Sequence, residues 1–165
     1  MSLELTNEYK DIAEKLQQKF PVNFDYLDFD KILFLVETEK VPKGKYAECR
    51  KVMAPYNFLT EYKFIITFYE GNMIGLTEAQ KVMVVFHELF HIDTDFEKIR
   101  KHDIEDFREV IMKAGNNPFW DIDPNLGNIL DDDDNTQPTP GTVAASSTIV
   151  DEDDSEDDTG EPEIL

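Results

Sequence analysis

The sequence predicts an α+β domain over residues 1–130, with a small three-stranded sheet, and a disordered acidic tail over residues 131–165. Two patterns predict the domain. Apolar residues three and four positions apart are typical of amphipathic helices, whereas short runs of β-branched and aromatic residues are typical of strands. Because these segments follow the order helix, strands, helix, helix, an α+β fold is favoured. An abrupt change in composition indicates the tail.

The N-terminal half is expected to hold one helix and three strands. Helical spacing of apolar residues predicts a helix over residues 3–19, and Pro21 ends it. These apolar residues are Leu5, Tyr9, Ile12, Ala13, Leu16 and Phe20. Strands are expected at residues 31–37, 46–53 and 62–69, with turn residues in VPKGK after the first and EGN after the third. The second strand is interpreted as the one that returns after the first.

Two further helices are expected in the second half of the domain. Thr77 opens an apolar helix, because Gln80 three residues later completes a capping-box pattern. A second amphipathic helix is expected from about Asp103 to Ala114, with Gly115 where a C-terminal cap belongs. Its apolar stripe consists of Ile104, Phe107, Val110 and Ile111.

The net charge of −20 is unevenly distributed. Residues 131–165 hold 13 acidic residues and no Lys or Arg, so residues 1–130 carry 23 acidic and 16 basic residues, a net charge of −7. The tail also lacks aromatic residues and is expected to be disordered, because it cannot bury enough surface to offset its ordering entropy. It is interpreted as a solubility element or as a regulatory or partner-binding arm. Neither part has the basic patch that direct nucleic-acid binding requires.

The location is predicted from features that the sequence lacks. The single cysteine, Cys49, excludes an intramolecular disulfide and suits a reducing compartment. The N-terminus MSLELTNEYK has no basic or apolar region of a signal peptide. No apolar run approaches the ~20 residues that span a bilayer. A soluble cytoplasmic protein without membrane partners is therefore expected, and its oligomeric state is left open.

Three polar residues interrupt the apolar helix over residues 82–92: His87, Glu88 and His91, in the pattern HExxH. Burial of such groups without partners costs roughly 1–3 kcal/mol each, so a compensating metal ion is indicated. Positions i and i+4 of a helix lie about 40° apart in azimuth and about 6 Å apart along the axis, which lets two imidazoles bind one tetrahedral Zn²⁺. Glu88 lies beside this seam and is expected to reach the water-bearing position as general base.

A catalytic zinc ion needs a third protein ligand and one open position. His102 is the candidate, because it is the only other histidine and starts the next expected helix. Asp103 and Asp106 are alternatives, either as ligands or as carboxylates that orient an imidazole. Cys49 is a further candidate, although a lone cysteine in a strand is more typical of packing.

The stretches FHELFHI and KHDIEDF together resemble the putative phage metallopeptidase family, which is similar in turn to the SprT-like zincins. The resemblance is concentrated in residues 60–112 and extends over residues 1–125. It implies a zincin-like fold, peptidase activity, a metal ion held by His87, His91 and His102, and an acid/base role for Glu88. A phage-encoded protein would act in the host cytoplasm. The glycine turn and third histidine of the longer metzincin motif are absent.

The functional hypothesis is a zinc-dependent metallopeptidase that acts on protein or peptide substrates. The alternatives are an acidic interaction or inhibitor protein with a structural or vestigial metal site, and a zinc hydrolase of non-peptide amides. In a peptidase, the strand at residues 62–69 could be a sheet edge that takes the substrate as an added strand, or simply part of the core. Tyr62 and Tyr69 are the candidates for oxyanion stabilisation. DIDPNLGNILDD, residues 121–132, imitates a calcium loop but has Leu126 where glycine is required, and a polar connection is preferred.

Overall fold

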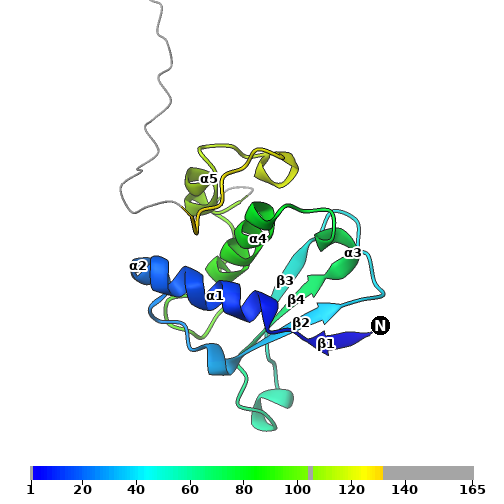
Figure 1. Cartoon of the computed structure of the whole chain (residues 1–165). Coiled ribbons are helices and arrows are strands. Elements are labelled where there is room, and N and C mark those ends of the chain that lie inside the picture. Colours follow the sequence, from blue (N-terminus) through cyan, green and yellow to red (C-terminus); the bar gives the residue numbers. More distant parts are fainter. Residues whose placement is uncertain (1, 104–105, 132–165) are drawn as a thin grey trace, which may run out of the picture.

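A computed structural model of the chain describes residues 2–103 and 106–131 (Figure 1). The acidic tail expected after residue 130 lies outside the described residues, apart from Asp131. Within the described part of the chain, no helix is long and apolar enough to cross a membrane.

The sheet has four strands rather than three, in the order β1-β2-β4-β3. The strands are β1 (Leu3–Leu5), β2 (Ile32–Glu37), β3 (Ala47–Lys51) and β4 (Phe64–Tyr69). The prediction of helix from residue 3 was wrong for the first residues, because Leu3–Leu5 pair antiparallel with residues 35–37 of β2. This long-range pairing outweighs the helical spacing of Leu5, and the helix α1 begins only at Glu8.

β3, which was expected to return beside β2, instead lies at the outer edge of the sheet, beside β4. β2 and β4 are parallel, from Ile32 beside Phe64 to Glu37 beside Tyr69. β3 pairs antiparallel with β4 and forms an outer strand of the sheet. β4 is therefore an inner strand, which corrects the suggestion that residues 62–69 form a sheet edge. Its composition gives the reason: FIITFY is apolar throughout except for Thr67, as suits a strand with neighbours on both sides.

Two helices cover one face of the sheet (Figure 1). α1 (Glu8–Lys19) crosses α4 (Glu78–Phe90), and α4 also contacts β3. The short helices α2 (Pro21–Phe24) and α3 (Glu70–Met73) follow α1 and β4, so Pro21 both ends one helix and begins the next. The core is dominated by fully buried side chains from the sheet and from both long helices. They include Leu16, Phe24, Phe64, Ile66, Phe68, Phe86 and Leu89.

The last helix, α5, is shorter than expected. It spans Arg108–Lys113 rather than residues 103–114, and Phe107 precedes its first turn in extended conformation. His102 and Asp103 lie in the connection before it, whereas residues 104–105 are outside the described residues. Gly115 has φ of +69°, the left-handed conformation expected of a residue just beyond a helix.

The capping box at the start of α4 is confirmed. The Thr77 hydroxyl accepts the Gln80 backbone N–H at 3.2 Å, and Gln80 Oε1 accepts the Thr77 N–H at 2.9 Å. Gln80 is only 4% exposed and also uses its amide as a donor. Its Nε2 donates to the carbonyl oxygens of Asp121 at 2.8 Å and Asp123 at 3.1 Å. One side chain therefore caps α4 and fixes the C-terminal 3₁₀ turn, Trp120–Ile122.

Gln80→Glu is expected to destabilise the protein by about 1–3 kcal/mol, the cost of leaving buried polar groups without partners. The glutamate keeps the acceptor for Thr77 but cannot donate to the carbonyls of Asp121 and Asp123. Urea unfolding measures the effect, with the exposed Gln18→Glu as a control that is expected to change stability by less than about 0.5 kcal/mol. Equal stability of both variants would contradict a structural role for the Nε2 contacts.

Candidate metal centre

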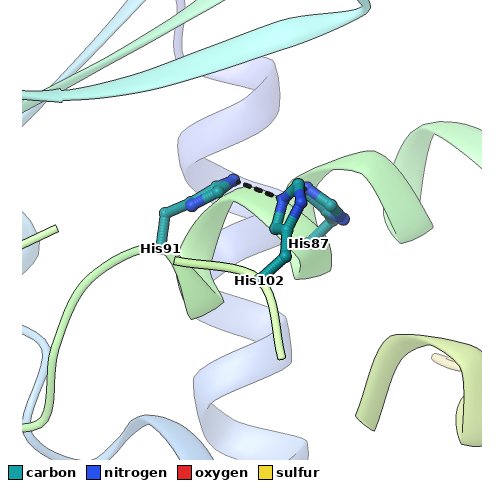
Figure 2. Close-up of side chains that lie close together, drawn as sticks. All are labelled: His87, His91 and His102. Carbon is teal, nitrogen blue, oxygen red and sulfur yellow. Dashed lines mark hydrogen bonds between the residues drawn. The ribbon is translucent and has the colours of Figure 1, made fainter. Parts of the chain in front are cut away.

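Three histidines converge at one end of α4 (Figure 2). His87 lies in the last turn of α4, and His91, four residues later, is its C-terminal cap residue. His102 comes from the segment that follows. The Nε2 atom of His102 lies 3.1 Å from His87 Nε2 and 3.2 Å from His91 Nε2. Within the described ranges, this is the only group of three or more His, Cys, Asp or Glu side chains placed to hold a metal ion.

The Nδ1 contacts orient two of the rings. His91 Nδ1 lies 3.0 Å from the Arg100 carbonyl oxygen, and His87 Nδ1 lies 2.7 Å from Asp106 Oδ1. A carbonyl oxygen and a carboxylate can only accept, so in the neutral imidazoles each Nδ1 carries the proton and each Nε2 keeps its lone pair. The two Nε2 atoms of α4 therefore face His102 as electron-pair donors.

This donor set fits a divalent metal ion. Burial lowers the pKa of His91 to about 4, which keeps its imidazole neutral and available as a ligand. When the two imidazoles of α4 are neutral, His102 Nε2 is the nitrogen of the three that can carry a proton, and one proton cannot make two full hydrogen bonds. Around a tetrahedral ion with bonds of 2.0–2.1 Å, ligand nitrogens lie roughly 3.4 Å apart. The two distances from His102 Nε2, 3.1 and 3.2 Å, are close to this value, and all three ligand atoms lie within 4.8 Å of one another.

The aromatic ring of Phe107 forms the base of the cluster. Its centroid lies 5.2 Å from that of His87 and 4.9 Å from those of His91 and His102. Phe107 is fully buried and also packs against Phe90. Phe107, one of the apolar residues expected for the last helix, therefore contacts all three imidazoles and limits how far they can rotate.

The two aspartates considered as alternative ligands lie elsewhere. Asp103 pairs with Arg100 at 2.8 Å. Asp106 Oδ1 lies 2.7 Å from His87 Nδ1, an ion-pair distance, and Asp106 Oδ2 accepts from the Trp120 indole N–H at 3.1 Å. Burial alone would raise the pKa of Asp106, but these contacts hold it below its ordinary value. Asp106 therefore occupies the position of a carboxylate that orients an imidazole, one of the two roles considered for it.

Glu88 is 5% exposed and faces the cavity that contains the histidines. Burial raises the pKa of its carboxyl group to about 7, against the opposing effects of His87 and the Cys49 backbone N–H. Its Oε2 atom has no hydrogen-bond partner among the described residues. A buried carboxylate oxygen without a protein partner is costly unless it serves a bound molecule such as water.

The histidine cluster opens into a cavity of about 940 Å³. Residues 44–49, which lead into and form most of β3, make one wall, and residues 118–121 make another. Cys49 lines this cavity but is not part of the ligand cluster, and burial raises the pKa of its thiol well above the ordinary value.

Neither tyrosine considered for oxyanion stabilisation lines this cavity. The Tyr69 hydroxyl donates to Glu48 at 3.0 Å, and Tyr62 lines a different depression. The segment that resembles a calcium loop forms no cluster of metal ligands among its described residues, 121–131. Asp123 instead accepts from the Asn117 side chain and from the Asn125 backbone N–H.

The comparison with known proteins agrees with the geometry. A family model described as "Putative phage metallopeptidase" matches residues 1–131. The chain belongs to this family. The match includes all three clustered histidines and Glu88, and ends at the start of the acidic tail. No curated protein and no solved structure matches the chain.

In this member of the putative phage metallopeptidase family, Asp106→Asn is expected to weaken metal binding about 10- to 100-fold, the usual effect of removing a carboxylate that orients a metal-ligating histidine. An amide has one acceptor oxygen, so it cannot accept from both His87 and Trp120. Competition with a chelator measures the affinity, and the exposed Asp30→Asn is the control. An unchanged affinity in Asp106→Asn would show that His87 is oriented without this carboxylate.

Proposed function

We propose that the protein is a zinc-dependent metallopeptidase with a zincin-like active site, in which His87, His91 and His102 hold the metal ion and Glu88 is the general base. The convergence of three Nε2 atoms is the observation that carries this proposal. Membership of the metallopeptidase family supports it independently. The catalytic unit is assigned to residues 1–130, because the family match ends at residue 131.

When bound, the metal ion would polarise the scissile carbonyl group and lower the pKa of water. The protein itself supplies the proton acceptor. In its ionised form, Glu88 takes a proton from the attacking water and delivers it to the leaving amine nitrogen. Its buried position and a pKa raised to about 7 suit both steps, because the group can exist as acid and as base near neutral pH.

The substrate is proposed to lie along β3 rather than along β4. β3 is an outer strand and its residues line the cavity beside Glu88. The unpaired backbone groups of an outer strand can bind an extended peptide as an added strand, with little selection for sequence. Protein or peptide substrates in an unfolded conformation are therefore expected.

The cavity favours a catalytic over a structural metal site. Structural zinc sites are closed by four protein ligands, whereas catalytic sites keep three ligands and an open position. The described residues bring three histidines together beside a cavity of about 940 Å³. An interaction or inhibitor protein would not need this opening, nor a buried carboxylate directed into it.

Metal analysis combined with a hydrolysis assay tests the proposal. The purified full-length protein should contain about one zinc ion per chain and should hydrolyse a denatured protein. Chelation should abolish turnover, and zinc should restore it. Zinc without hydrolysis of proteins or peptides would favour the structural site, and hydrolysis restricted to small amides would favour the non-peptide hydrolase. A protein that binds no divalent metal ion would refute both hydrolase functions and would favour an interaction or inhibitor protein with a vestigial site.

A further inference from the structure

The segment between α4 and His102 determines where His102 lies relative to His87 and His91. His87 and His91 are held by helix α4, but His102 lies in a connection outside any helix or strand. A ligand on such a connection contributes more to metal affinity when the connection is fixed, because less freedom is lost on binding. Arg100, two residues earlier, makes contacts that fix it.

We propose that Arg100 is a positioning residue: its side chain fixes the segment that carries His102 against α4 and thereby sets the affinity of the site for its metal ion. This inference rests on the proposed metal site. It assigns to Arg100 no contact with the metal ion or the substrate.

The backbone of Arg100 folds back onto the end of α4. Its N–H donates to the His91 carbonyl oxygen at 2.7 Å, and its own carbonyl oxygen accepts from His91 Nδ1 at 3.0 Å. Ile92 and Ile99 form an antiparallel bridge within the same turn of chain. These contacts bring the chain back to α4 just before His102, but they involve no side chain of Arg100 and would persist in a variant.

The side chain of Arg100 joins this turn to the residues on either side of the cluster. Its guanidinium group lies 4.9 Å from the Phe107 ring centroid and 5.6 Å from that of Phe90. Its Nη2 atom lies 2.8 Å from Asp103 Oδ2 and 3.6 Å from Glu109 Oε2. The cation therefore connects the residue after His102, the first turn of α5, and the aromatic ring that contacts all three imidazoles.

The geometry suits arginine better than lysine. A planar guanidinium group can stack on an aromatic face while its edge donates to one carboxylate and lies near a second, whereas an ammonium group is a compact point charge. Without the cation, Asp103 and Glu109 would lose a shared partner, and the Phe107 ring would lose the group that covers it. Only about a third of the Arg100 side chain is exposed, so these contacts are partly shielded from water.

Metal affinity in Arg100→Ala and Arg100→Lys tests the inference. With full-length protein and Zn²⁺, chelator competition should show about a 10- to 100-fold weaker affinity for Arg100→Ala, as for other residues that position metal ligands. Arg100→Lys should lie between this variant and the wild type. Lys31→Ala, which removes a cation that also pairs with an aspartate but lies outside the cavity, should match the wild type.

A Co²⁺-loaded sample adds a readout that a purely structural role would not move. Loss of His102 from the coordination sphere should weaken the visible absorption of tetrahedral Co²⁺ in Arg100→Ala. Unchanged affinity and absorption in Arg100→Ala would overturn the inference, even if the metal-free variant were less stable. If Arg100→Ala does not fold, wild-type affinity in Arg100→Lys would overturn it. Absence of metal from the wild type would instead refute the proposed function, and this inference with it.

Discussion

The Glu88→Gln variant is expected to bind metal like the wild type but to hydrolyse peptide bonds about 100- to 10,000-fold more slowly, the usual contribution of a general base. Glutamine has the same shape as glutamate but cannot accept a proton. The carboxylate is directed into the cavity, and its Oε2 atom has no partner among the described residues. Its replacement should therefore disturb no contact of that atom within the protein, and the loss should appear in kcat.

The measurement compares turnover of a denatured protein, and metal content, between the wild type and Glu88→Gln. Glu14→Gln, at a half-exposed position on α1, makes the same change of charge away from the cavity and should leave both quantities unchanged. Equal turnover in Glu88→Gln and wild type would reject Glu88 as the base. Loss of metal from Glu88→Gln would show instead that the Glu88 carboxylate contributes to metal affinity.

Helix α4 could be predicted in detail because its signals are local. The cap residues Thr77 and Gln80 lie three residues apart, and the apolar positions repeat within each turn. The sheet could not be predicted in the same way. Whether β3 pairs with β2 or with β4 depends on contacts between residues far apart in sequence, and the short turn after β2 suggested the wrong neighbour. Strand composition alone does not specify the partner.

The site shows the same division between local and distant information. The pair His87 and His91 follows from the periodicity of one helix, and the addition of His102 from its short distance along the chain. The contact of Trp120 with Asp106 could not be predicted, because the indole comes from a 3₁₀ turn 14 residues later. The role of the Arg100 carbonyl was equally inaccessible, since every residue carries a carbonyl and only the fold selects one.

His102→Ala is expected to weaken metal binding by more than about 100-fold, beyond the upper end of the effect expected for residues that only orient a ligand. His102 Nε2 is the atom within 3.2 Å of both other Nε2 atoms, so its removal leaves two ligands on one helix. Two imidazoles cannot complete the three-ligand set that a catalytic site requires. Elemental analysis after dialysis, together with chelator competition, measures the loss.

Comparison with Asp106→Asn decides how a smaller effect of His102→Ala on metal affinity would be interpreted. Asp103 and Asp106 are each occupied by other partners, Arg100 and His87, so neither is placed to replace His102. If His102→Ala kept the wild-type affinity while Asp106→Asn lost metal entirely, Asp106 rather than His102 would be the third ligand. The opposite order of effects is expected, because a residue that binds the ion contributes more to affinity than one that orients a ligand.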